Sequence, residues 1–251
     1  MIQRASTLKQ ALKLAARVAV PGSALALLLA RVSAGASAGG LVRLGVGGQV
    51  SGAGDWWDPN DAGLCIWAAY SPEGAADLAS SYLDLSGNGN NAGVGVAPTW
   101  DAVNGWKLTT AQYLTTTFAP QIDQSQTLIV KFSNLTNTGV IAGCYEGFNR
   151  QFRIQPDNGS AAVLYGNGNQ ALKAPALSAG NLCVAGSDGY RDGVSESIGI
   201  GGWGVATART VFIGGMNQGS LQSGCAVYIQ KMALYDCTLT SSEVAAVYAA
   251  M

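Results

Sequence analysis

The stretch from Gly224 to Val247 constrains the fold most, because a strand, a turn and a helix start follow one another directly. Cys225 to Tyr235 is rich in aromatic, β-branched and large apolar residues and contains neither Gly nor Pro. This composition predicts a strand with both faces at least partly covered. A covered strand needs a sheet around it, so we expect a β-rich domain to precede it.

The residues after this strand predict a short C-terminal helix. Thr240 precedes Glu243 by three residues, which is the spacing of a capping box. Leu239 and Val244 occupy the two positions of a hydrophobic staple, and Val244 and Val247 share one helical face.

From Asp55 onward, short apolar runs alternate with turns rich in Gly and Asn, a rhythm typical of an antiparallel sandwich. Glu73 to Tyr82 predicts a short helix between them. The expected strands before the closing one are Leu64–Tyr70, Trp106–Leu108, Gln112–Thr117, Thr127–Phe132, Gly139–Ala142, Gln151–Ile154, Ala161–Tyr165, Asn181–Ala185 and Val211–Ile213. No parallel βαβ rhythm is visible.

Several segments follow the order of motifs in one known family. They are DLSGNGNN (Asp84–Asn91), GWKLTTAQYL (Gly105–Leu114), LCVAGSDGYRDGV (Leu182–Val194), VFIGG (Val211–Gly215) and the closing strand and helix. Together they resemble laminin-G-like domains of the concanavalin A-like class. The resemblance implies an all-β, antiparallel jelly-roll sandwich with a short C-terminal helix. CIWAAYSPEGAADLASSYLDLSGNG followed by APTWDAVNGW also resembles versions of this domain in structural proteins of tailed bacteriophages.

Residues 1–54 differ from the remainder in charge and predict a partly helical arm. They carry six basic and no acidic side chains before Asp55, whereas the remaining residues carry eight basic and fifteen acidic ones. Arg4 to Val20 predicts a basic amphipathic helix that ends at Pro21-Gly22, and Ser23 to Val32 predicts a second, apolar one. A Gly- and Ala-rich linker follows. Six charges over this length are too dilute to favour contact with nucleic acid.

Three interpretations of this arm are open. A secretory signal is suggested by the basic start, the apolar run and the small residues Ala34, Ala36 and Ala38, although Pro21-Gly22 interrupts the run. A membrane span would need about 20 apolar residues, more than this run provides. We favour an arm that docks onto other subunits. Its docking residues would be Leu8, Leu12, Val18, Leu25, Leu28 and Leu29.

The titratable residues offer no familiar catalytic set. There is no His, which removes the usual general base and the commonest metal ligand. Jelly-roll glucanases, which the resemblance brings in, would require closely spaced carboxylates, and no Glu here has a second carboxylate two residues away. We therefore expect no enzymatic activity, no catalytic residue and no cofactor. Asp55, Asp58 and Asp61 could form a calcium loop, but a solvated turn is favoured.

The five cysteines contain no CxxC pair and are odd in number, which argues against a disulfide framework or a zinc site. We expect free, buried thiols in a protein that folds in a reducing cytoplasm.

Aromatic and amide side chains leave glycan binding open. The candidate contacts are Trp56, Trp57, Asn88, Asn90 and Asn91, with core packing as the alternative role for the aromatics. The sequence therefore predicts a non-enzymatic virion structural protein of a tailed phage: a head decoration, or a tail or fibre component. It would be made in the bacterial host cytoplasm, form homo-oligomers, dock to other virion subunits through residues 1–54 and display a domain over residues 55–251. The alternative is a secreted or surface lectin-like carbohydrate-binding module of a bacterium.

Overall fold

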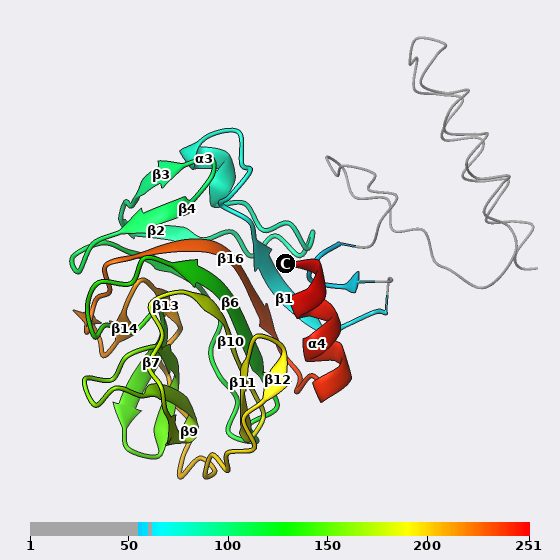
Figure 1. The fold of residues 1–251 in the computed structure, drawn as a ribbon, viewed down its shortest axis with the longest axis vertical. Coiled ribbons are helices and arrows are strands. Elements are labelled where there is room, and N and C mark those ends of the chain that lie inside the picture. The colour runs from blue at the N-terminus through cyan, green and yellow to red at the C-terminus, as the bar shows by residue number, and fades with distance from the viewer. Residues whose placement is uncertain (1–54, 60–61) are drawn as a thin grey trace, which may run out of the picture. The chain divides into compact units, whose positions relative to one another are not determined.

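The computed structural model describes residues 55–59 and 62–251, so the predicted arm, with its docking residues Leu8, Leu12, Val18, Leu25, Leu28 and Leu29, lies outside the described residues. The described chain is an all-β sandwich of two sheets with a short C-terminal helix, as the sequence predicts (Figure 1). No helix in this part of the chain is long and apolar enough to cross a membrane.

The first sheet is antiparallel throughout and is built around β16 (Val227–Tyr235), which confirms the predicted closing strand. One edge of β16 pairs with β6, and the other edge is shared by β4 and β1. The sheet runs in the order β12 (Val194–Ser195), β11 (Asp188–Arg191), β10 (Gly180–Ala185), β6 (Thr127–Ser133), β16, β4 (Gly105–Leu108) and β3 (Thr99–Asp101), with β1 (Ile66–Tyr70) beside β16.

The second sheet contains one parallel pair, β7 with β14, among antiparallel ones. Its path is β15 (Leu221–Gln222), β14 (Met216–Asn217), β7 (Ala142–Gly147), β13 (Phe212–Ile213), β5 (Tyr113–Thr115) and β2 (Gly93–Val96), with β8 (Arg150–Gln155) beside β7 and β9 (Val163–Lys173) beside β8. β7 begins where the predicted strand Gly139–Ala142 ends, so that prediction was misplaced by several residues.

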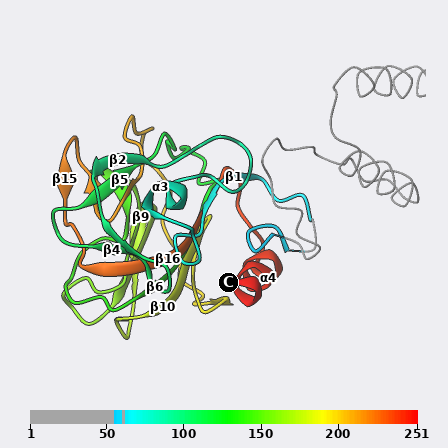
Figure 2. The same ribbon diagram turned by 90° about the horizontal axis from the view of Figure 1, so that it is seen from above.

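Apolar side chains fill both the space between the sheets and the outer face of the first sheet. Met232 and Leu234 of β16 belong to the core between the sheets. Ala233 and Tyr235 belong to a second cluster that also contains Val244 and other residues of α4 (Ser241–Ala250). Figures 1 and 2 show α4 outside the sandwich, and α4 contacts β12. The alternation of a strand sends successive side chains to opposite faces, and this explains why β16 is apolar on both.

The two helices predicted within residues 55–251 are present, and each begins at a capping residue. The backbone N–H of Thr240 donates to Oε2 of Glu243 at 2.7 Å, and the backbone N–H of Glu243 donates to Oγ1 of Thr240 at 3.3 Å. The predicted capping box of α4 is therefore confirmed. The earlier helix is shorter than the predicted Glu73–Tyr82, because α3 (Leu78–Ser81) begins only after its own cap at Asp77.

The prediction of five free cysteines is wrong for two of them. Cys65 and Cys237 form a disulfide, with their Cα atoms 5.9 Å apart. They are 172 residues apart in sequence, and the antiparallel pairing of β1 with the end of β16 brings them together. Cys144, Cys183 and Cys225 are free and buried, as predicted. The argument for a reducing cytoplasm therefore no longer holds.

Candidate functional site

The polar side chains of DLSGNGNN (Asp84–Asn91) hold the loop itself in place. The carboxylate of Asp84 accepts hydrogen bonds from the backbone N–H groups of Ala69, Ser86 and Asn90, at 2.9 to 3.0 Å. It also accepts from the hydroxyl of Ser86 at 2.7 Å. Asp84 therefore fastens the loop that follows α3 to strand β1.

The predicted glycan contacts in this loop point their amides at β1. Nδ2 of Asn88 donates to the carbonyl of Ile66 at 2.7 Å, and Nδ2 of Asn90 donates to that of Trp67 at 2.7 Å. Asn91 accepts from the backbone N–H of the loop's own aspartate at 2.8 Å. These amides are engaged within the protein, and their role as glycan contacts stays a prediction.

The two tryptophans of the same prediction lie elsewhere, beside the second apolar cluster. Trp57 is buried, and its carbonyl accepts from the hydroxyl of Tyr235 at 2.8 Å. Trp56 is half-buried and lies 5.6 Å from the Trp57 ring in an edge-to-face arrangement, with Nζ of Lys231 5.7 Å from its ring. Most of their surface serves packing, so a glycan role here also stays a prediction.

For Asp55, Asp58 and Asp61 the sequence favours a solvated turn over a calcium loop, and the structure describes the first two of these residues. Asp58 accepts from the backbone N–H groups of Gly63 and Leu64, at 3.1 and 3.3 Å, which is the arrangement of a turn. Asp61 lies outside the described residues. Within residues 55–59 and 62–251, no three His, Cys, Asp or Glu side chains gather closely enough to hold a metal ion.

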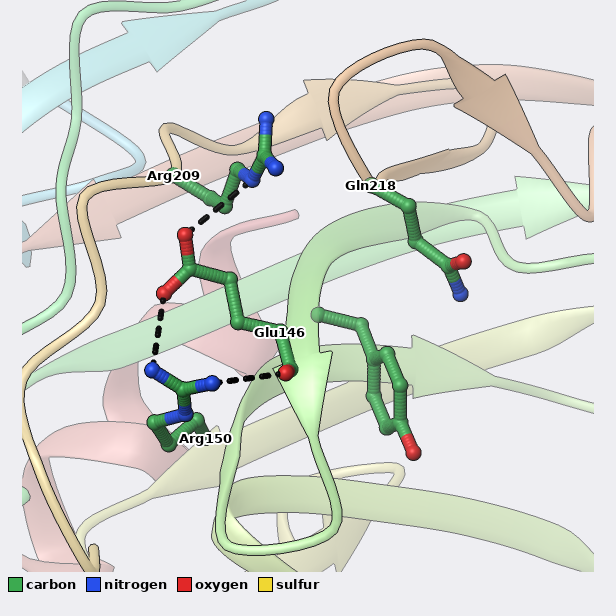
Figure 3. Close-up of a pocket in the computed structure, with 5 residues that line it drawn as sticks. Glu146, Arg150, Arg209 and Gln218 are labelled. Atoms are coloured by element: carbon green, nitrogen blue, oxygen red, sulfur yellow. Dashed lines mark hydrogen bonds and ion pairs between the residues drawn. The ribbon is translucent and has the colours of Figure 1, made fainter.

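An open hollow of about 310 Å³ at the β7–β8 hairpin is the best candidate site (Figure 3). Tyr145 and Glu146 come from the end of β7, and Arg150 comes from the start of β8. Arg209 lies in the loop before β13, and Gln218 lies in the turn between β14 and β15. The site therefore joins one hairpin to two segments that are distant in sequence.

Glu146 lies between two guanidinium groups (Figure 3). Its Oε1 is 3.1 Å from Nε of Arg209, and its Oε2 is 3.5 Å from Nη1 of Arg150. Nη2 of Arg150 also donates to the backbone carbonyl of Glu146 at 3.0 Å. One carboxylate faces two guanidiniums, so the three side chains keep one net positive charge.

The strand alternation of β7 and β8 places a third arginine beside this hollow. Phe152 and Ile154 face the core, so Arg153 faces the outer side of the sheet with Tyr145. The Arg153 guanidinium lies 5.4 Å from the Tyr145 ring, and burial lowers its pKa. A Cβ at Gly143 would come within 2.4 Å of the Arg153 Cβ, so only glycine leaves room here.

An exposed aromatic ring marks the tip of the same hairpin. Phe148 is 61% exposed. The backbone N–H of Gly204 donates to the carbonyl of Asn149 at 3.0 Å and ties a second loop to the tip. That loop carries Val205, which is 55% exposed. The polar and charged groups of the hollow are therefore close in sequence to the exposed apolar ring of Phe148.

Sequence reasoning missed this site because it searched for histidines, paired carboxylates and tryptophans. One feature of the sequence did indicate the site, namely the clustering of arginines. Residues 55–251 contain four arginines, and two of them, Arg150 and Arg153, occur in the short run NRQFR. The structure adds Arg209, whose position no local pattern could indicate.

No protein-family model and no curated protein matches this sequence. Solved structures match at low identity. A botulinum neurotoxin serotype D binding domain is 10% identical with a TM-score of 0.50, over 74% of this chain and 50% of that chain. The HCR/D F1240A mutant is 13% identical with a TM-score of 0.51, over 74% and 51%. Trypanosoma rangeli sialidase in complex with the inhibitor DANA is 18% identical with a TM-score of 0.49, over 73% and 32%.

This chain thus spans about half of the first two proteins and a third of the sialidase. The likeness to the first two shows a shared β-sandwich fold, consistent with the jelly-roll class that the sequence resembles.

The prediction that this chain is not an enzyme is corrected by these matches, because they include a sialidase, which is an enzyme. The sequence argument demanded a His or a closely spaced carboxylate pair. Some glycosidases use a Tyr nucleophile, so the lack of those groups excludes no glycosidase chemistry.

Proposed function

We propose that residues 55–251 recognise carbohydrate at the β7–β8 hairpin. The observation that carries the proposal is the hollow lined by guanidinium, amide and phenol groups in the same hairpin as the exposed ring of Phe148. Sugars present hydroxyl groups that need directional hydrogen bonds and C–H faces that pack on aromatic rings. This hairpin offers partners for both.

The fold supports a recognition role as well. The neurotoxin domain with the same sandwich is itself described as a binding domain. A rigid sheet that carries a short hairpin and adjacent loops is a common way to hold binding residues in place.

The disulfide supports a location outside a reducing cytoplasm. Such bonds persist on secreted proteins and on cell or virion surfaces. The finer proposal is a structural protein of a tailed-phage virion, in which several copies dock through residues 1–54 and display the sandwich. Its support is the sequence resemblance of the segments from Cys65 to Trp106. The secreted lectin-like module of a bacterium is the second setting, and the disulfide favours it equally.

A glycan array probed with the full-length, oxidised protein tests recognition. We expect binding to a defined set of glycans. Phe148→Ala and Tyr145→Phe should each weaken it, the former by about tenfold, since a buried aromatic contact contributes roughly 1.4 kcal/mol. Val103→Ala is the matched control, because Val103 is 75% exposed in the turn between β3 and β4, on the other sheet. Unchanged binding in both hairpin variants, or no bound glycan at all, would refute the proposal.

The virion setting has its own test. Mass spectrometry of purified phage particles from a producing strain should detect this chain, and deletion of residues 1–54 should remove it from the particles. A chain found only in the culture medium would favour the secreted module.

A further inference from the structure

The hairpin site is positively charged within an acidic domain. Residues 55–251 carry fifteen acidic and eight basic side chains. Three of their four arginines, Arg150, Arg153 and Arg209, nevertheless lie at or beside the hollow, with Glu146 as the carboxylate among its lining residues. Placing like charges close together costs electrostatic free energy, and the single carboxylate of Glu146 offsets only part of that cost.

Arg209 keeps its outer edge available. Glu146 engages Nε of Arg209, and no described residue accepts a hydrogen bond from its two Nη atoms. The outer edge of a guanidinium binds a carboxylate through two parallel hydrogen bonds. Figure 3 shows these Nη atoms turned away from Glu146.

The backbone holds Arg209 in this position. A Cβ at Gly219, where φ is +96°, would lie 2.7 Å from Nη1 of Arg209. Nδ2 of Asn217 donates to the carbonyl of Thr210 at 2.9 Å and joins the β14–β15 turn to the loop that carries Arg209. The β14–β15 turn therefore packs against the Arg209 guanidinium, and the missing side chain at Gly219 leaves space for it.

We infer that the hollow selects acidic saccharides, those that carry a carboxylate, over neutral ones. This inference rests on the proposed carbohydrate recognition. The ligand carboxylate would occupy the outer edge of Arg209 and neutralise the one net charge left by Arg150, Glu146 and Arg209. Gln218 and Tyr145 would contact sugar hydroxyls. The Glu146 carboxylate, which holds Nε on the other edge of the same guanidinium, would repel the ligand carboxylate.

Paired saccharides that differ only at their carboxylates test this directly by calorimetry on the full-length protein: sialyllactose against its neutral methyl ester, and digalacturonate against the neutral disaccharide galactobiose. We expect each acidic member to bind at least about tenfold more tightly, because a charge-assisted hydrogen bond contributes more than a neutral one. Raising the ionic strength should reduce this preference. Inorganic phosphate as a competitor at equal concentration should displace neither acidic sugar; full displacement would mean a general anion site and would overturn the inference.

Two substitutions should act in opposite directions. Arg209→Gln should remove the acidic preference, so that the acidic and neutral members of each pair bind this variant with equal affinity. Glu146→Gln should strengthen acidic binding, since it removes the repelling charge and keeps a hydrogen-bonding side chain. Lys107→Gln is the control of equal charge change, because Lys107 lies on β4 of the other sheet.

The two failures are distinguishable. Equal affinity for acidic and neutral members, or weaker acidic binding in Glu146→Gln, overturns the acidic preference while recognition stands. Absence of binding to every member of both pairs, together with an empty glycan array, overturns the proposed function itself. If Arg209→Gln does not fold, as judged by its thermal melt, Glu146→Gln still decides the inference.

Discussion

Removing the disulfide should destabilise the sandwich measurably. Cys65 lies just before β1 and Cys237 just after β16, so the bond closes a loop of 172 residues. In the chain-entropy treatment, a loop of this length restricts the unfolded chain by about 5 kcal/mol at 25 °C. Measured effects are commonly smaller, about 2–4 kcal/mol, because the reduced chain keeps residual structure.

We expect the double variant Cys65→Ser, Cys237→Ser to unfold roughly 5–15 °C below the wild type, since about 1 kcal/mol shifts Tm by 2–4 °C in a domain of this size. Thermal melts followed by circular dichroism measure the shift. Dithiothreitol should lower the wild-type Tm to that of the variant and leave the variant unchanged. Coincident melts of oxidised wild type, reduced wild type and variant would refute the reasoning.

Thiol counting checks that the bond is the cause. The native protein should expose no reactive thiol, because Cys144, Cys183 and Cys225 are buried and burial raises the pKa of the Cys144 thiol to about 12. Denaturation without reductant should release three thiols, and reduction should release five.

Two further stability measurements test local contacts. Thr240→Ala should lower the free energy of unfolding by about 1 kcal/mol in urea titrations through loss of the α4 cap, whereas Thr109→Ala, at an exposed position, should change it by less than about 0.5 kcal/mol; equal effects would contradict the capping argument. Hydrogen bonds from the backbone N–H groups of Asn104 and Val103 hold the pKa of Asp101 below its usual value. The carboxylate therefore stabilises the fold above about pH 4, and this contribution is lost as the pH falls through the lowered pKa. Urea midpoints between pH 2 and 6 should fall less steeply for Asp101→Asn than for the wild type, and parallel slopes would count against the assignment.

The sequence predicted those parts of the fold that local chemistry specifies. An apolar run on both faces predicted strand β16, and a capping box predicted helix α4. Both signals come from residues that are close together in sequence, within the element that they predict. Strands of two residues, such as β12, β14 and β15, have no period to detect, and only their neighbours define them. The disulfide likewise depends on which strands pair, and spacing along the chain does not contain that information.

The site was harder to predict for a related reason. Three of the lining residues, Tyr145, Glu146 and Arg150, lie within six positions of the sequence. The hollow forms only because folding also places Arg209 and Gln218, from two distant segments, beside them. The amides of DLSGNGNN looked suitable for a ligand because the sequence does not show where backbone carbonyls lack partners.

The register of β1 explains this difference between the two sets of polar side chains. The pairing of β1 with β16 shifts between Ile66 and Ala68, and such an irregularity leaves backbone groups without ladder partners. Asn88 and Asn90 donate to the carbonyls of Ile66 and Trp67 at this point. A ligand that recruited either amide would leave a carbonyl unsatisfied, which costs about 1–3 kcal/mol when that group is buried. At the hairpin, no described residue accepts from the outer edge of Arg209 or bonds the side chain of Gln218, so a ligand gains those contacts without breaking any.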